Sequence, residues 1–459
     1  MSKGKRYRKE SEDTTTKKKR EKGRRFASDE DIKEKFGITD EDDDKENDKY
    51  VQQSQVRYEK RRARRQKQNK REIKISRWFY YILGILLVAA LGALIFVGLR
   101  SCSTEEVTDW YNTTTKGQGL GDGFPAQIVG NNISVGNFFS VNKDVVAVSD
   151  TALLRLNTTA KVQLNHQHSY NRPILKVAGD KMMVYNLGST GYSIETNEKT
   201  IHKADAGNNI MAADLAENGR YALVTDATGY PSQMTVYLEN NQEQYKYSFS
   251  GYYVTGIALN HDATGAVVTA ISAENGGIIS AVYVFDFTKE TPTAVLTYPD
   301  TLITGIEYNR SGTVIAVGDT MTSIINSSTG TKVDYPYSDR QLSGYSIDGD
   351  YVALALEPYD SASTNQIVIL DQTGNVFASL DITEKATSIS LLGDTVATLQ
   401  RGTVIAYSVN AMRNQDTSSG TGVTAFSTQD AGTDAKAVAL CDESSVYVLG
   451  ISEIRYLKL

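Results

Sequence analysis

The chain has 459 residues, with 49 Lys and Arg against 55 Asp and Glu, so its formal net charge is −6. Two cysteines are too few for a domain held together by a disulfide framework. The charge total hides a division, because residues 1–77 carry a net +10 (27 basic, 17 acidic) and the rest a net −16 (22 basic, 38 acidic). The sequence therefore predicts two different surroundings for the two parts, and an acidic part that does not bind anionic polymers.

The N-terminal part, residues 1–77, is predicted to be a largely disordered basic tail. Its first 25 residues are charged and nearly free of large apolar side chains, which is typical of disorder. Residues 28–36 are predicted to form a short helix with acidic residues in its first turn. Residues 50–77 contain no Pro or Gly, and we expect a juxtamembrane helix there.

An uncharged apolar run of 22 residues, 78–99, follows the tail. As a helix rising about 1.5 Å per residue, it is long enough to cross a bilayer core of about 30 Å. Ten basic residues lie between Lys60 and Arg77, whereas residues 100–123 hold only two. Positive charge stays on the cytoplasmic side, so we expect a single-pass cell-membrane protein with its N-terminus inside and its C-terminal domain outside. A cleaved signal peptide has a shorter basic region and a shorter apolar run.

The ends of the predicted span indicate its surroundings. Trp78, Tyr80 and Tyr81, with Arg77 before them, are expected at the membrane interface. The basic residues from Lys60 to Arg77 predict contact with anionic lipid headgroups; they lack interleaved aromatic residues, so we expect no nucleic-acid partner. Small residues inside the run predict at most a weak homodimer through the span. These small residues are Gly84, Ala89, Gly92 and Ala93.

One unit recurs eight times between residue 124 and the C-terminus, after a polar, glycine-ended linker at 100–123. The unit is an alternating strand, a tight turn rich in Gly and Asp, and a second strand rich in Val, Ala and Tyr. The turns are 36 to 49 residues apart, close to the period of four-stranded propeller blades. The second strands are expected at 145–149, 181–185, 221–225, 266–270, 313–317, 351–355, 395–399 and 444–448.

The two ends of this region are complementary. The last repeat has only three strands, at 436–440, 444–448 and 454–459, and a fourth is available at 124–130. Combining strands from both termini in one blade closes a ring and removes two open sheet edges. The sequence therefore predicts an all-β propeller of eight four-stranded blades over residues 124–459. Seven blades are the alternative if one repeat is irregular.

Three turn segments carry a family resemblance: SIDGDYVALAL (346–356), NRSGTVIAVG (309–318) and AENGRYALV (216–224). They resemble the turns of bacterial propellers of the TolB, YVTN and quinoprotein-like type, although no Trp follows residue 110 and the WD dipeptide is absent. The arrangement of basic tail, single span and exported propeller resembles an uncharacterised Gram-positive (Firmicutes-type) membrane-protein family of unknown function. The resemblance implies a fold and supplies no catalytic residues.

Residues able to carry chemistry are sparse. His166 and His168 lie on one side of a predicted strand, which is a spacing that can hold a metal. No Cys or third His is close in sequence, so surface histidines are the favoured interpretation. Four aspartates at predicted turns are explained by hydrogen bonding to the turn backbone, with an acidic ring around a channel as the alternative. These are Asp214, Asp262, Asp348 and Asp350.

The remaining candidate is Cys441, which follows an apolar alternation and is interpreted as a packed thiol rather than a partner of Cys102. We expect no catalytic residues and no cofactor. The leading hypothesis is a membrane-anchored extracytoplasmic propeller that acts as a non-catalytic binding or scaffolding module at the cell envelope, with an envelope protein or a wall polymer as partner. A quinone- or metal-dependent enzyme and a single-span envelope sensor are the alternatives.

Overall fold

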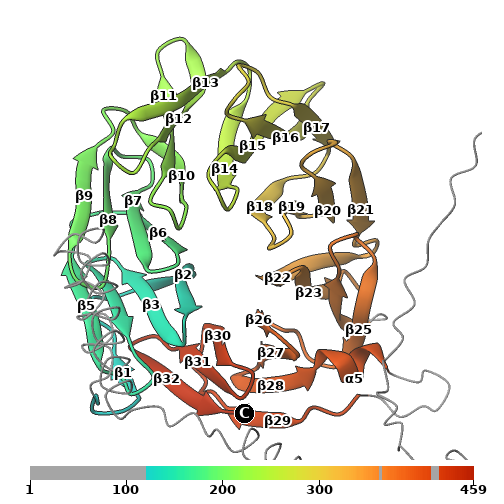
Figure 1. Cartoon of the computed structure of the whole chain (residues 1–459). Coiled ribbons are helices and arrows are strands. Elements are labelled where there is room, and N and C mark those ends of the chain that lie inside the picture. Colours follow the sequence, from blue (N-terminus) through green and yellow to red (C-terminus); the bar gives the residue numbers. More distant parts are fainter. Residues whose placement is uncertain (1–119, 361–363, 415–422) are drawn as a thin grey trace, which may run out of the picture. The chain divides into compact units, whose positions relative to one another are not determined.

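The computed structural model describes residues 120–360, 364–414 and 423–459, and the strands in these residues form eight antiparallel sheets of four strands each. The sheets stand as blades in a ring around a common centre (Figure 1). Within a blade the strands follow one another in the chain from the channel outwards, except in the last blade, which also takes a strand from the N-terminal end. The eight-bladed prediction is therefore confirmed and the seven-bladed alternative is wrong.

The first four blades lie between residues 133 and 299. Blade 1 comprises β2 (Ile133–Val141), β3 (Asp144–Ser149), β4 (Ala152–Leu156) and β5 (Val162–Gln167). Blade 2 comprises β6 (Pro173–Ala178), β7 (Lys181–Asn186), β8 (Gly191–Glu195) and β9 (Thr200–Asp205). Blade 3 comprises β10 (Ile210–Leu215), β11 (Tyr221–Ala227), β12 (Tyr230–Tyr237) and β13 (Glu243–Phe249). Blade 4 comprises β14 (Tyr253–Leu259), β15 (Gly265–Glu274), β16 (Gly277–Asp286) and β17 (Ala294–Pro299).

The other four blades complete the ring. Blade 5 comprises β18 (Ile303–Tyr308), β19 (Thr313–Gly318), β20 (Met321–Asn326) and β21 (Lys332–Pro336). Blade 6 comprises β22 (Arg340–Asp348), β23 (Tyr351–Pro358), β24 (Asn365–Leu370) and β25 (Val376–Ile382). Blade 7 comprises β26 (Ser388–Leu392), β27 (Thr395–Gln400), β28 (Thr403–Ser408) and β29 (Ser427–Asp430). Blade 8 comprises β30 (Ala437–Asp442), β31 (Ser445–Leu449), β32 (Glu453–Lys458) and β1 (Ala126–Gln127).

The ring is closed in blade 8, as the unequal ends of the repeat region predicted. β1 pairs antiparallel with β32, with Ala126 opposite Ile454. β1 has two residues, so the predicted strand at 124–130 is too long. On the N-terminal side of β1 the chain leaves the sheet edge, because Pro125 has no N–H to donate. The N–H groups of Gly121 and Gly123 bond to Thr159 in blade 1 instead.

The second strand of each blade is buried on both faces, because each sheet packs between two neighbouring blades. In β3, Val145 and Ala147 pack with residues of blade 8, whereas Val146 and Val148 pack with residues of blade 2. Alternate side chains of one strand therefore serve two interfaces. This explains why the second strands contain nearly continuous apolar residues, small enough for two sheets to approach.

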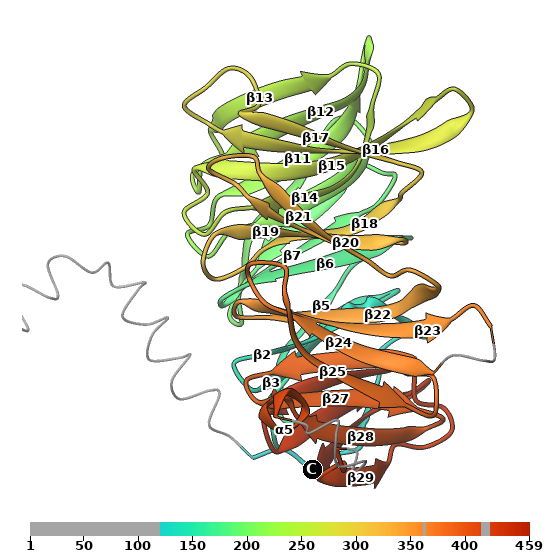
Figure 2. The same cartoon turned by 90° about the vertical axis from the view of Figure 1, so that its right-hand side faces the viewer.

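Two features depart from the simple repeat. Blade 7 contains a short helix, α5 (Val409–Arg413), which the sequence analysis did not predict. The Ser408 hydroxyl caps it by accepting a hydrogen bond from the N–H of Ala411 at 3.1 Å. In blade 4, β15 and β16 form a hairpin paired from Gly265 to Glu274, which projects from one face of the ring (Figure 2).

Candidate functional site

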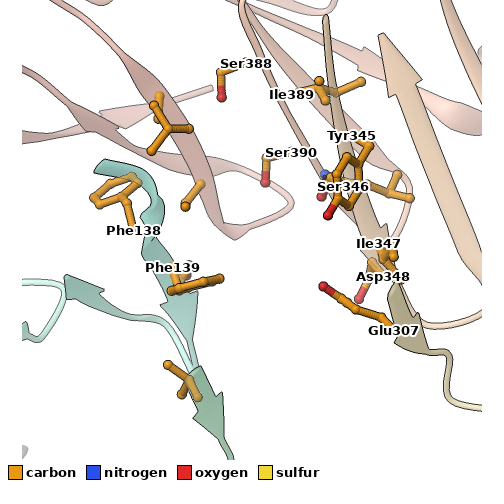
Figure 3. Close-up of a pocket in the computed structure, with 18 of the residues that line it drawn as sticks. Phe138, Phe139, Glu307, Tyr345, Ser346, Ile347, Asp348, Ser388, Ile389 and Ser390 are labelled. Atoms are coloured by element: carbon orange, nitrogen blue, oxygen red, sulfur yellow. Dashed lines mark hydrogen bonds between the residues drawn. The ribbon is translucent and has the colours of Figure 1, made fainter. Parts of the chain in front are cut away.

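The innermost strands of the eight blades surround a cavity of about 820 Å³. These strands are β2, β6, β10, β14, β18, β22, β26 and β30. Small-molecule sites in proteins occupy roughly 300–1,000 Å³, so this channel is large enough for a ligand. Figure 3 shows part of the wall, with Phe139 on one side of the open space and Tyr345 and Glu307 on the other.

Many polar side chains of the innermost strands bind one blade to the next. A side-chain oxygen on one innermost strand accepts a hydrogen bond from a backbone N–H of the next innermost strand. These bonds join Asn137 to Leu175 (3.0 Å), Asp214 to Leu259 (2.7 Å), Ser346 to Leu391 (3.0 Å), Ser388 to Val438 (3.1 Å) and Ser390 to Leu440 (3.0 Å). The polar character of these five side chains is therefore explained by bonding between blades, and it does not require a catalytic role.

We expect Ser388→Ala to lower the free energy of unfolding by about 1–3 kcal/mol, because it leaves the buried N–H of Val438 without an acceptor. Ser327→Ala is the matched control, since the Ser327 hydroxyl only bonds the carbonyl of Gly312 at an exposed turn. The control should change stability by no more than about 0.5 kcal/mol. Urea unfolding measures both values, and an equal loss in the two variants would contradict the inter-blade role.

Four charged side chains line the cavity, each from a different blade: Lys176 on β6, Asp214 on β10, Glu307 on β18 and Asp348 at the end of β22. The Nζ of Lys176 lies 4.0 Å from an Oδ of Asp214, and the two side chains are 34% and 17% exposed. Within the described residues, Glu307 has no hydrogen bond or ion pair, and its side chain is exposed to the channel. The four groups carry a formal net charge of −2, from one ammonium and three carboxylates.

The pKa values of Lys176, Asp214 and Glu307 reflect a partly dehydrated surrounding. Although Glu307 faces the open channel, the surrounding blades displace water from around its carboxylate and raise its pKa; the nearby Lys176 opposes the shift and the Asp214 carboxylate adds to it. Burial also raises the pKa of Asp214 against the opposing effect of Lys176. For Lys176, burial acts to lower the pKa, but the neighbouring acids outweigh it and the pKa is raised. Negative charge is therefore costly here unless a cation is close.

Aromatic rings frame the same part of the cavity. Tyr345 on β22 packs across Gly305 so closely that a Cβ at this glycine would collide with the tyrosine hydroxyl. Burial and the nearby Glu307 raise the pKa of Tyr345 to about 12, so the phenol stays neutral. Phe138 and Phe139 enter the cavity wall from blade 1.

The wall at blade 1 is distorted by a wide bulge in β2. Ile133 pairs with Ser149 and the next paired residue is Phe138, opposite Ala147, so residues 134–137 protrude from the ladder. Val135 and Gly136 of this bulge line the cavity. The bulge is anchored by the Asn137 amide, which donates to the carbonyl of Pro173 at 2.8 Å. Bulges of this kind re-aim side chains and are frequent beside binding sites.

The two histidines singled out from the sequence lie outside the cavity. His166 Nδ1 is 2.9 Å from a carboxylate oxygen of Glu195 in the next blade. His168 stacks on Tyr170 at 5.2 Å, and burial lowers the pKa of its imidazole. Across residues 120–360, 364–414 and 423–459, no three His, Cys, Asp or Glu side chains are grouped so that they could hold a metal ion.

Three of the four predicted turn aspartates lie at or beside turns, and two of these link neighbouring blades. Asp348 accepts a hydrogen bond from the N–H of Gly393 at 2.8 Å, and Asp350 accepts one from Ser311 at 3.0 Å. The turn prediction is wrong for Asp214. The strand β10 continues to Leu215, so Asp214 lies inside this strand, where it lines the channel.

Cys441 is a buried free thiol, and burial raises its pKa. Cys102, its conceivable partner, lies outside the described residues. The tail, the span and the interface residues Arg77, Trp78, Tyr80 and Tyr81 also lie outside them. In the part of the chain that the structure describes, no helix combines the length and the apolar character needed to cross a bilayer.

The fold defines this chain as an eight-bladed β-propeller with a ligand-sized central channel. It belongs to a family of unknown function, DUF5711, whose sequence profile matches residues 127–448. The predicted family of unknown function and the propeller fold are thus confirmed, while the Gram-positive origin and the membrane anchor stay predictions. No curated protein matches the chain.

Solved propellers share the fold at low sequence identity. The C-terminal WD40 domain of Sif2 is 11% identical with a TM-score of 0.52, covering 73% of this chain and 99% of that domain. BamB from Moraxella catarrhalis is 11% identical with a TM-score of 0.46, covering 73% of this chain and all of that one (100%). Identities this low establish the fold alone.

Sequence reasoning missed the channel residues Lys176, Glu307 and Tyr345. Lys176 and Glu307 are each a single charge within an otherwise uncharged strand, PILKVA in β6 and ITGIEY in β18. A single charge in the otherwise uncharged first strand of a repeat indicates a channel residue, because the first strand of each blade borders the channel.

Proposed function

We propose that this protein is a membrane-anchored, extracytoplasmic β-propeller that acts as a non-catalytic binding or scaffolding module at the cell envelope. The observation that carries the proposal is that polar side chains of the channel wall bond one blade to the next. Serine, asparagine and aspartate side chains hold neighbouring blades together, and the other charged groups include no metal-binding cluster among the described residues. A rigid ring around a ligand-sized channel is suited to recognition rather than to a chemical step.

The anchoring part of the proposal rests on the sequence. The 22-residue apolar run at 78–99 is long enough to cross a bilayer, and the ten basic residues from Lys60 to Arg77 favour a cytoplasmic tail in contact with anionic lipid headgroups. The acidic character of the rest of the chain suits an exported, soluble domain.

A candidate contact surface for an envelope protein or wall polymer lies on the loops of blades 3 and 4. Tyr230, Tyr253 and Ile278 are exposed there. Tyr230 and Ile278 follow turns between second and third strands, and Tyr253 begins an innermost strand. In an antiparallel blade these positions lie at the same face of the ring. Exposed apolar side chains gathered on one face are typical of interaction sites.

A labelling experiment in intact cells tests the topology. In a full-length Cys102→Ser background, a membrane-impermeant maleimide should label Ser328→Cys, at an exposed turn of blade 5, without lysis. Ser11→Cys in the tail should react only after lysis. Labelling of the tail in intact cells, or protection of Ser328→Cys, would refute the extracytoplasmic placement.

Site-specific photocrosslinking in the same cells tests the binding role. A crosslinker at Tyr253 or Ile278 should capture a defined envelope component. The matched control is Val295, which is also exposed but lies on the outer strand of blade 4. The absence of a product that is specific to the loop positions would reject these loops as the binding surface.

A further inference from the structure

One carboxylate of the channel, that of Glu307, has neither an ion pair nor a hydrogen bond among the described residues. The ammonium of Lys176 lies 4.0 Å from Asp214, and Asp214 also accepts the Leu259 N–H, so these two charges have partners. Glu307 has none within the described residues, although it lies in the wall of the same cavity. A cation is therefore the class of ligand whose charge the channel lacks.

The surroundings of Glu307 favour an organic cation over a metal ion. No group of three or more metal-ligating side chains occurs in the described parts of the chain. The lining instead presents apolar and aromatic side chains, and Ile306 precedes Glu307 on β18. Tyr345 and Ile347 of β22 lie on the same side as Glu307, and Phe139 of β2 faces them across the open space (Figure 3). Aromatic faces attract ammonium groups through their ring quadrupoles, and apolar walls bind hydrocarbon.

An anionic ligand fits less well. The only cationic side chain that lines the cavity in the described residues is Lys176, and it is already close to Asp214. An anion there would meet three carboxylates, those of Asp214, Glu307 and Asp348, for one ammonium. The cavity therefore selects by charge as well as by size.

We propose that the central channel is a binding site for a small organic ammonium ion with an apolar body, whose ammonium pairs with Glu307 and whose body lies against Phe139 and Tyr345. The bulge at residues 134–137, which is held by Asn137 and brings Val135 into the wall, forms the blade 1 side of this site. The inference deepens the proposed binding function by naming a ligand class for the channel. It does not involve the loop surface at Tyr253 and Ile278.

Calorimetric titration of the full-length protein in a nonionic detergent tests the proposal, with 2-phenylethylammonium as the probe. We expect saturable binding of one probe per chain. The neutral analogue 2-phenylethanol should bind at least about tenfold more weakly, because it has the same apolar body and no charge. Each compound is also titrated into protein-free detergent, and affinities refer to its free concentration, because the neutral alcohol partitions into micelles more strongly than the cation does.

Glu307→Gln should weaken probe binding by about tenfold or more, since it keeps the size of the side chain and removes its charge. Glu274→Gln, at the tip of the β15–β16 hairpin, is the matched control and should bind as the unmodified protein does. Lys176→Gln, which removes a like charge from the cavity, should bind the probe more tightly. A merely structural role for Lys176 does not predict a gain, and circular dichroism verifies that each variant is folded.

Three results would overturn the inference: no saturable binding of the probe, equal binding of the alcohol, or full affinity in folded Glu307→Gln. None of them affects the capture of an envelope component through Tyr253 or Ile278, which tests the proposed function separately. Conversely, charge-selective binding in the channel without any captured component would retain the ligand site and reject the loops of blades 3 and 4 as the binding surface.

Discussion

Asp144→Ala is expected to lower the free energy of unfolding by about 3–5 kcal/mol, because it leaves the buried guanidinium of Arg155 without its counter-charge. Asp144 accepts hydrogen bonds from Arg155 Nε at 3.0 Å and from a terminal nitrogen at 2.9 Å. The Arg155 side chain is only 4% exposed, so water cannot replace the lost carboxylate. Urea unfolding of the full-length protein measures the loss.

Replacing both partners should recover most of this stability. The second terminal nitrogen of Arg155 is buried without a partner among the described residues, and burial raises the pKa of Asp144 although Arg155 opposes the shift. The attraction within the pair therefore does not offset the desolvation of Asp144. We expect the double variant Asp144→Leu/Arg155→Met to be close to the unmodified protein in stability, as found for other buried ion pairs replaced by apolar residues.

The exposed pair between Arg401 and Glu384 is the matched control for this cycle. Its side chains are 80% and 40% exposed, so Glu384→Ala should cost no more than about 1 kcal/mol. If Asp144→Ala lowers the free energy of unfolding no more than Glu384→Ala does, burial does not govern the energetics of the Asp144–Arg155 pair and the prediction fails.

Tyr447→Ala should also destabilise the protein by about 3–5 kcal/mol, because it empties a large volume at the joint between the last and first blades. Tyr447 is fully buried in β31, its ring lies 5.5 Å from those of Phe124 and Tyr456, and its hydroxyl donates to the Lys143 carbonyl of blade 1 at 2.7 Å. Tyr447→Phe keeps the ring and loses only the hydroxyl, so it should cost about 1–3 kcal/mol. Urea unfolding ranks the two variants.

The role of Tyr447 in ring closure has its own readout. Limited proteolysis near residues 120–130 should accelerate in Tyr447→Ala, because the short strand β1 has two residues paired with β32 and the Phe124 ring beside it packs on Tyr447. Phe249→Ala, a comparable loss of a buried ring in blade 3, should destabilise the chain without exposing this segment first. Equal cleavage in both variants would argue against a closing role.

The blade count and the closure were predictable because their signals are local. A Gly- or Asp-rich turn between alternating strands specifies a hairpin wherever it occurs, and eight such turns predict eight sheets. The unequal ends of the repeat region identified blade 8 as the closing blade, and β1 pairs there. The length of β1 was not predictable, because it depends on where Gly121 and Gly123 bond to blade 1.

The candidate site was not predictable from spacing. Lys176, Asp214 and Glu307 belong to blades 2, 3 and 5, so no motif in the sequence joins them. The Asp214 turn prediction failed for the same reason, since only the register of β10 against β11 places this residue within the strand and at the channel. The helix α5 was not predicted, because five residues are too few to show a helical period.

The sequence by itself determined the class of the fold, because alternation and turns are properties of neighbouring residues. The tether at 78–99 is a prediction from apolar length and charge asymmetry, which are also local properties. The tertiary structure alone decided which charges share the channel, which polar side chains serve as inter-blade bonds and where Glu307 is left unpaired. The physical reason is that closing the ring brings residues from distant repeats around one axis, where only the three-dimensional arrangement sets their distances and their access to water.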